Sequence, residues 1–281
     1  MSVRAKVNYW LAPGLPSVEL SSADYGAQRF SPHWHAGFAV GIVTRGTQGF
    51  RARGRAWRVR AGDLILLDPR EVHDGFALAP GGWSSRMAYV PEGDFAALAG
   101  IEPSRRFVRP CMQSPQLAAL FLAWHRACAG TTDIREHPLT SQLFTGIAAL
   151  MQRSEAAMPS APGTGLREQL QLAARADAQV RPLTTALNLS RSGTWRRVKT
   201  QFGLAPKPLL KHLRLMEAKS LLAQGRPIVE AALACGFHDQ SHLTRQFAAA
   251  YGFTPAQFRR AQITGRSGQD RWAAPRQKEN A

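Results

Sequence analysis

The chain has 281 residues, of which 44% are hydrophobic, and a formal net charge of +17. This length is typical of two domains, and the hydrophobic content is enough for ordinary buried cores. No run of about 18 apolar residues occurs, so no membrane partner is expected. The amino terminus lacks a long apolar core, and the scattered Cys111, Cys128 and Cys235 suggest no disulfide framework. We therefore expect a cytoplasmic location.

The positive charge is uneven along the chain. Residues 166–281 hold 19 Lys and Arg against 7 Asp and Glu, a net of 19 − 7 = +12, and residues 1–165 hold the remaining +5. A basic carboxyl-terminal half indicates a polyanion partner, of which double-stranded DNA is the leading candidate. A general preference for arginine in the source proteome is the alternative explanation.

Residues 28–91 are predicted to form strands. Short apolar segments are separated there by Gly, Asp and Pro, as in half-buried antiparallel strands of a small barrel or sandwich. The segment "FRARGRAWRV" alternates, which places Arg51, Arg53, Arg55 and Arg58 on a solvated face rather than in an anion site.

Two amphipathic helices are predicted over residues 115–130 and 139–156. Their apolar residues recur at helical spacing and form one face on each. These faces either cover the barrel or form the seam of a homodimer, and the sequence leaves both open. The fold class is therefore α+β in two domains: a barrel with appended helices (1–156), a linker (157–165), an all-α domain (166–262) and a disordered tail (263–281).

The all-α half contains two similar helix–turn–helix units. In the second, Gly236 supplies a sharp turn, Phe237 fills the angle between the helices, and Asp239 is the N-cap of the next helix. Leu243 and Phe247 are expected to be buried. The first unit has Ser190 as its N-cap, and one long helix over about 206–225 joins the two units.

Residues 214–260, "RLMEAKSLLAQGRPIVEAALACGFHDQSHLTRQFAAAYGFTPAQFRR", resemble the DNA-binding domain of the AraC/XylS family of transcription regulators. The resemblance covers residues 166–262 and implies two helix–turn–helix units, each with one recognition helix in the major groove. The positions it assigns to DNA contact are Ser192, Trp195, Arg196 and Lys199 in the first unit and Gln240, Ser241, His242 and Arg245 in the second. Gln and Arg suit this role because they pair bidentately with adenine and guanine.

The first unit departs from the family pattern. Gly193 lies inside its recognition helix, where glycine costs about 1 kcal/mol against alanine. Thr194 and Val198 stand where the family has larger residues. We therefore expect this unit to be irregular and its base contacts to be weaker.

The amino-terminal half resembles the cupin barrel in its AraC-family, effector-sensing form. The carriers are "FSPHWHAGFAVGIVTRG" and "RAGDLILLDPREVHDG", with His33, His35 and His73. In a metal-bearing cupin such histidines bind a metal together with a glutamate, but Phe38-Ala39-Val40 stand where the acid is expected. Three histidines alone could hold zinc with water. The alternatives are packing residues of the barrel and contacts to an organic effector.

A closed small barrel can hold one small ligand in its interior. The residues predicted to contact this effector are aromatic and imidazole side chains: His33, Trp34, His35, His73, Trp83 and Tyr89. The prediction assigns no catalytic residue, no metal and no cofactor.

The sequence therefore predicts a DNA-binding transcription regulator, not an enzyme, controlled by a small-molecule effector. RNA polymerase is a further candidate partner, and activation and repression are both open. Two other hypotheses are a metal-dependent cupin enzyme with a helical appendage and a non-specific nucleic-acid packaging protein.

Overall fold

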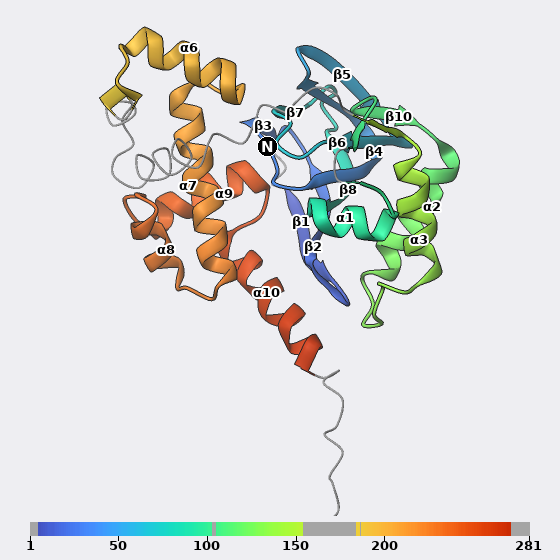
Figure 1. Ribbon diagram of the computed structural model, residues 1–281. Helices are drawn as coiled ribbons and strands as arrows, with labels where there is room; N and C mark the ends of the chain where they lie inside the picture. Colours follow the sequence, from blue (N-terminus) through green and yellow to red (C-terminus); the bar gives the residue numbers. More distant parts are fainter. Residues whose placement is uncertain (1–4, 103–104, 154–183, 186, 271–281) are drawn as a thin grey trace, which may run out of the picture.

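The computed structural model describes residues 5–102, 105–153, 184–185 and 187–270, with side chains up to residue 263 (Figure 1). A strand-rich half lies beside a helical half. The strands are β1 (Lys6–Ala12), β2 (Leu15–Tyr25), β3 (Arg29–His33), β4 (Phe38–Ala52), β5 (Arg55–Arg60), β6 (Asp63–Leu67), β7 (His73–Ala77), β8 (Trp83–Val90), β9 (Arg105–Phe107), β10 (Cys111–Gln113) and β11 (Met151–Arg153). The helices are α1 (Glu92–Ala99), α2 (Pro115–Ala127), α3 (Pro138–Ala148), α6 (Arg191–Phe202), α7 (Pro206–Ala223), α8 (Ile228–Ala234), α9 (Gln240–Tyr251) and α10 (Pro255–Asp270).

The strands form an antiparallel barrel-like sheet organised around β4. The order β1-β2-β8-β4-β6-β10 forms one path, and β5 and β7 also pair with β4, while β3 pairs with β7. The 15-residue β4 therefore pairs with β6 and β8 along its first part and with β5 and β7 along its last part. It bends at Gly46, where φ is 72° and an added Cβ would lie 2.2 Å from the carbonyl oxygen of Gly82. Only glycine fits at this close contact between β4 and the residue before β8. The predicted barrel is confirmed.

Helices α1, α2 and α3 cover one face of the barrel. Phe121 and Trp124 of α2 and Phe144 of α3 are buried in one core with Leu20 and Phe38 of the strands. The apolar faces predicted from the sequence therefore cover the barrel, and these side chains are not available for a homodimer seam. The predicted helix over 139–156 ends earlier, at Ala148, because residues 151–153 pair with β9 instead.

The helical half ends later than the sequence predicts. Helix α10 runs to Asp270, so residues 263–270 are helical and the prediction of a disordered tail from residue 263 is wrong for them. The helix starts at Pro255 and meets no second proline before Pro275, so no residue forces it to stop. The linker predicted over 157–165 and the end of the tail lie outside the described residues.

The two halves pack together through an aromatic cluster. Tyr9 of β1 stacks on Phe253 with ring centroids 4.5 Å apart and lies 5.4 Å from Phe258 of α10. Buried residues of the barrel and of α7, α8 and α9 belong to one continuous core. Figure 1 shows α10 beside β1 and β2, which the sequence interpretation had not recognised as strands. The docked halves enclose the space described below.

Candidate DNA-binding helices and sensor cavity

Helix α9 is held at a sharp angle to α8 by the turn that the sequence predicts. Gly236 has φ of 71°, and Phe237 is only 5% exposed. Asp239 is the N-cap: its Oδ1 accepts the backbone N–H of His242 at 2.6 Å, and this bond lowers the pKa of the carboxyl group. Leu243 and Phe247 are fully buried. The local turn, cap and buried stripe are confirmed.

The predicted contact residues of α9 differ in their solvent exposure. Gln240, Ser241 and Arg245 are exposed on its first two turns. His242 is half-buried and stands edge-on to Phe237, with ring centroids 5.4 Å apart. Packing therefore holds His242, whereas the other three present their polar groups to solvent.

Helix α6 is continuous through Gly193. Ser190 caps it by accepting the Gly193 N–H at 3.1 Å, so the expected irregularity is not present in this helix. Thr194 and Val198 are buried, and the Thr194 hydroxyl has no hydrogen-bond partner among the described residues. The supporting helix predicted for this first unit falls mostly outside the described residues.

Helix α6 exposes all four of its predicted contact residues to solvent. Ser192 and Arg196 are exposed, and the large Trp195 side chain is 51% exposed. The Lys199 Nζ donates to the carbonyl oxygen of Gly203 at 2.7 Å. Lys199 therefore caps the carboxyl end of its own helix, where a cation is favoured.

Helices α6 and α9 are equivalent copies, displaced by 49 residues. Their caps are separated by 239 − 190 = 49, and both 12-residue helices end on a left-handed glycine. The same offset matches buried pairs, exposed pairs and the starts of the next helices: Thr194 with Leu243, Val198 with Phe247, Ser192 with Ser241, Arg196 with Arg245, and Pro206 with Pro255. Arg196 and Arg245 thus occupy the same position on two equivalent helices, which α7 and α8 connect.

A cavity of about 190 Å³ lies inside the barrel and opens toward the helical half. Five of the six predicted effector residues line it: His33, His35, His73, Trp83 and Tyr89. The rest of its wall includes residues that the sequence interpretation missed, namely Glu19, Phe30, Gln48, Phe50, Asp74, Lys219, Tyr251 and Phe253. The cavity therefore has aromatic walls and a few polar groups, as small-molecule sites do.

Trp34 does not line the cavity, so its prediction as a lining residue is wrong. Successive residues of an extended segment point to opposite sides, so Trp34 faces away from the side that His33 and His35 share. Its ring stands edge-on to His212 of α7, with centroids 4.1 Å apart. His212 is 5% exposed and its Nε2 has no hydrogen-bond partner among the described residues. Trp34 is thus a contact between the two halves.

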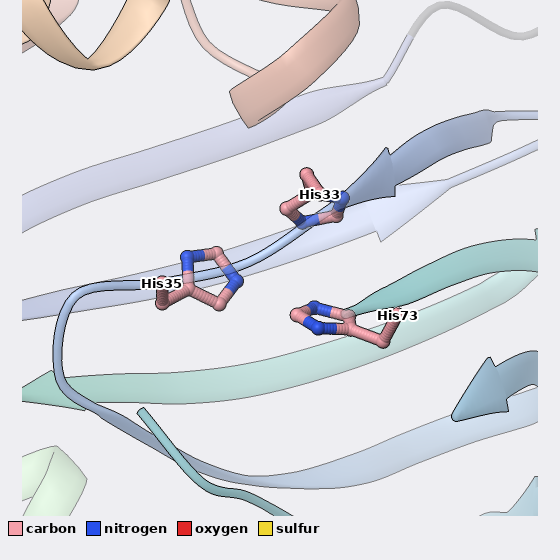
Figure 2. A group of neighbouring side chains, drawn as sticks. All are labelled: His33, His35 and His73. Carbon is pink, nitrogen blue, oxygen red and sulfur yellow. The ribbon is translucent and has the colours of Figure 1, made fainter. Parts of the chain in front are cut away.

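Three histidines meet at the cavity wall (Figure 2). His33 and His73 are paired in the register of β3 and β7, and their ring centroids are 4.4 Å apart. Burial lowers the pKa of His33 to about 3, with the His73 charge adding to the effect, and burial lowers the pKa of His73 to about 4. The pKa of His35 is also well below its usual range, first because of burial. All three rings are therefore neutral near pH 7.

The residues fit a metal set of three nitrogens and not the cupin set that includes a glutamate. Phe38, Ala39 and Val40 are buried and apolar where that acid would stand. The acids on the cavity wall are engaged elsewhere: Asp74 with Arg51 and Glu19 with Lys219.

The ion pair between Glu19 and Lys219 crosses from the barrel to the helical half. Glu19 lies on β2 and Lys219 on α7, and both side chains are mostly buried. Their separation of 200 residues in sequence explains why the sequence interpretation missed them. Lys219 stands in the segment that resembles the family, but no local pattern there indicates a partner in the barrel.

Arg53 is exposed, as the alternation predicts, but its guanidinium is also held in ion pairs. It lies in the β4–β5 turn with φ of 53° and pairs with Asp68 and Glu71, each at 2.9 Å. It also donates to the carbonyl oxygens of Phe107 and Val108. Arg53 therefore ties the turn to β9, while the neighbouring Arg55 and Arg58 remain exposed.

A barrel with a cavity, docked on a pair of equivalent capped helices, is the arrangement of a transcription regulator with a ligand-binding domain and a DNA-binding domain. Residues 15–157 match the family model of the AraC-like ligand binding domain, and residues 183–261 match a helix-turn-helix domain. The chain belongs to the AraC-like family of regulators. No helix among the described residues is long and apolar enough to cross a membrane.

Named relatives share this assignment to differing extents. The chain is 23% identical to the uncharacterized HTH-type transcriptional regulator YbfI of Bacillus subtilis, over 77% of this chain and 82% of that protein. It is 23% identical to the HTH-type transcriptional activator RhaS of Klebsiella pneumoniae, over 82% and 87%. It matches the regulator MtrA of Neisseria gonorrhoeae at 34% identity, but over only 28% of this chain and 26% of that protein.

Solved structures show a similar fold over nearly the whole chain. ToxT from Vibrio cholerae with bound unsaturated fatty acid has a TM-score of 0.53 and 11% identity, covering 92% of this chain and 95% of that one. An apo variant of ToxT has a TM-score of 0.52 and 11% identity, covering 93% and 98%. At this identity the likeness establishes the fold alone.

Proposed function

We propose that this regulator reads DNA with α6 and α9 and that a small molecule in the barrel cavity controls it. The observation that carries the DNA proposal is the 49-residue repeat. It puts Arg196 and Arg245 at the same exposed position of two capped helices, with the long helix α7 and the short helix α8 between them. Two such helices suit successive major grooves, about 34 Å apart along the duplex.

The predicted contacts divide by their surroundings. Arg196, Gln240 and Arg245 carry free polar groups suited to base edges, and Ser192 and Ser241 suit phosphate or base. Trp195 offers an exposed apolar ring. Lys199 and His242 stand nearby, but each is engaged within its own unit, so they would support the helices more than read bases.

The test is selection of duplexes from a random library by the purified chain, followed by footprinting and affinity measurement. We expect protection of two adjacent major grooves and affinity that falls as salt rises. Arg245→Ala and Arg196→Ala should each cost about 1–3 kcal/mol and relax preference at one or two positions. The matched control is Arg58→Ala, which removes the same charge from the exposed side of β5.

An equal loss of affinity on every duplex would favour non-specific packaging and contradict the proposal. So would the absence of any selected sequence. A loss as large for Arg58→Ala as for Arg245→Ala would show that net charge, and not the reading helices, controls binding.

The proposed effector is small, with an apolar body and a polar group. The cavity volume of about 190 Å³ suits a small molecule. Phe30, Trp83 and Phe253 supply apolar wall, and Tyr89 and Lys219 supply polar groups. Fatty acid is bound in one ToxT structure, which makes amphiphilic acids a sensible first panel. We expect binding to raise the melting temperature of the wild type and not of a Trp83→Ala variant.

The remaining assignments follow from this role. We propose a non-enzymatic regulator of the cytoplasm, with domains at 1–156 and 166–262, which the family matches at 15–157 and 183–261 support. RNA polymerase is the proposed partner at a promoter. A homodimer through α2 and α3 would have to use their exposed sides, such as Ala119 and Ala123, since their apolar faces cover the barrel.

A further inference from the structure

Three histidines of the cavity are arranged like the ligands of one metal ion. His33, His35 and His73 each offer one nitrogen, and these atoms all lie within 4.8 Å of one another. Figure 2 shows the rings around one shared space. Zinc–nitrogen bonds of about 2.0–2.1 Å place tetrahedral ligand atoms roughly 3.4 Å apart, so the nitrogens need to approach one another by at most about 1.4 Å. Side-chain rotation can supply such a movement.

Hydrogen bonds fix the protonation of two of these rings. The Nδ1 of His33 lies 2.8 Å from the carbonyl oxygen of Ser31, and the Nδ1 of His73 lies 2.9 Å from that of Glu71. A carbonyl oxygen only accepts, so each Nδ1 must carry the proton, which leaves the lone pair of a neutral ring on Nε2. No described residue bonds to either Nε2. Metal-ligating histidines are held in this way by a second hydrogen bond.

The donor set selects the class of ion. Neutral imidazoles without a thiolate or a free carboxylate suit borderline divalent transition metals, such as Zn²⁺, Co²⁺ and Ni²⁺, rather than Mg²⁺ or Ca²⁺. Three ligands leave at least one coordination position open. That position would face the cavity, where water or a donor atom of a small molecule can fill it.

We propose that the barrel binds one divalent transition-metal ion through Nε2 of His33 and of His73 and one ring nitrogen of His35, and that this ion regulates DNA binding. The inference rests on the proposed function and goes beyond it by naming an ion at the sensor site. It departs from the sequence interpretation, which assigned no metal.

The structure also supplies a route from the ion to the reading helices. His33 and His35 flank Trp34, so ordering these two ligands orders the residue between them. Trp34 contacts His212 of α7, the helix that joins α6 to the second reading unit. The ion thus fixes the backbone segment on which α7 rests.

The first test measures metal binding on the untagged full chain after chelator treatment. Co²⁺ is titrated by its visible absorption bands, and Zn²⁺ is then used to displace it. We expect one ion per chain, and at least 100-fold weaker binding for His35→Ala and His73→Ala. His238→Ala is the matched control, because His238 is exposed on the turn before α9. Circular dichroism is used to check that each variant is folded. If His73→Ala is not folded, His73→Gln replaces it.

Absence of stoichiometric binding, or binding that the triad variants leave unchanged, overturns the proposal. So does weakening by His238→Ala that equals the effect of the triad variants.

The second test measures affinity for a library-selected duplex with and without one equivalent of Zn²⁺. We expect the ion to change affinity at least fivefold, as allosteric effectors commonly do. Trp34→Leu and His212→Ala should remove this change while keeping one Co²⁺ site. An unchanged DNA affinity, or a metal effect that survives both variants, refutes the regulatory route. Specific DNA binding that does not depend on metal contradicts this inference alone. The absence of specific binding both with and without Zn²⁺ contradicts the proposed function.

Discussion

The ion pair between Glu19 and Lys219 joins the two halves of the chain, so removing one partner should destabilise their docking. The two side chains are 22% and 24% exposed. The Lys219 Nζ also lies 5.3 Å from the centre of the Tyr251 ring and 5.4 Å from that of Phe258. We choose Lys219→Met because it keeps the unbranched stem that packs on these rings and removes only the charge.

The magnitude follows from the burial of the pair. Removing one partner of a fully buried ion pair costs about 3–5 kcal/mol, whereas an exposed pair contributes about 0–1 kcal/mol. For this intermediate burial we expect Lys219→Met to cost about 2 kcal/mol, a factor of about 30 in the folded-to-unfolded ratio. Glu19→Gln should cost about 1 kcal/mol. The double variant should lie within about 1 kcal/mol of the wild type, because neither partner is then left uncompensated.

The assay is equilibrium unfolding in urea, which does not screen charges. Tryptophan fluorescence monitors the unfolding. Glu230→Gln is the control, since the Arg226–Glu230 pair is 64% and 57% exposed and should change stability by less than about 0.5 kcal/mol. The reasoning is refuted if Lys219→Met costs no more than this control. It is also refuted if the two single effects add in the double variant to within about 0.3 kcal/mol.

Three further predictions concern separate parts of the chain. Burial lowers the pKa of His125 to about 4, so its contribution to stability should be lost as pH falls from about 6.5 toward 4, at about 1 kcal/mol per pH unit. His125→Gln should flatten that fall in urea unfolding, and an unchanged slope would contradict the assignment. Trp195→Ala should weaken binding to a selected duplex at least fivefold without lowering the melting temperature, because the ring is half exposed; anisotropy and thermal unfolding check both, and an unchanged affinity would remove Trp195 from the interface. Gly236→Ala should destabilise the chain by about 1–2 kcal/mol because φ is 71° there; a neutral result in urea would show that the turn relaxes freely.

The second helix–turn–helix unit could be predicted from sequence because its signals are local. Gly236, Asp239 and the spacing of Leu243 and Phe247 each determine geometry within a few residues. The same locality explains the success with Ser190, whose cap is complete within one turn.

Strands β1 and β2 were missed because burial there does not follow hydrophobicity. In β2 the serine Ser21 is 4% exposed beside the fully buried Val18 and Leu20. The Ser21 carbonyl oxygen bonds to His125, which lies on α2. A polar residue buried by a distant partner leaves no periodic pattern to detect.

The cavity could be predicted only in part for the same reason. His33, His35 and His73 come from motifs of one domain, and alternation would have excluded Trp34 had it been applied to the β3–β4 segment. Lys219 reaches the cavity only because the helical half docks on the barrel. That docking depends on packing between residues far apart in sequence, which no local pattern encodes.

Helix α10 gives the 49-residue repeat a further meaning. Its start at Pro255 corresponds to the start of α7 at Pro206, yet the two copies have different neighbours. Helix α7 leads from one reading helix into the next unit, whereas α10 lies against β1, where Gln257 bonds to the carbonyl oxygen of Val7. The helix that follows the second copy, α10, thus packs against the barrel. The distance between α6 and α9 is then set within the helical half, by α7, α8 and their turns, so the spacing of the two half-sites in the operator should be the same whatever the cavity binds.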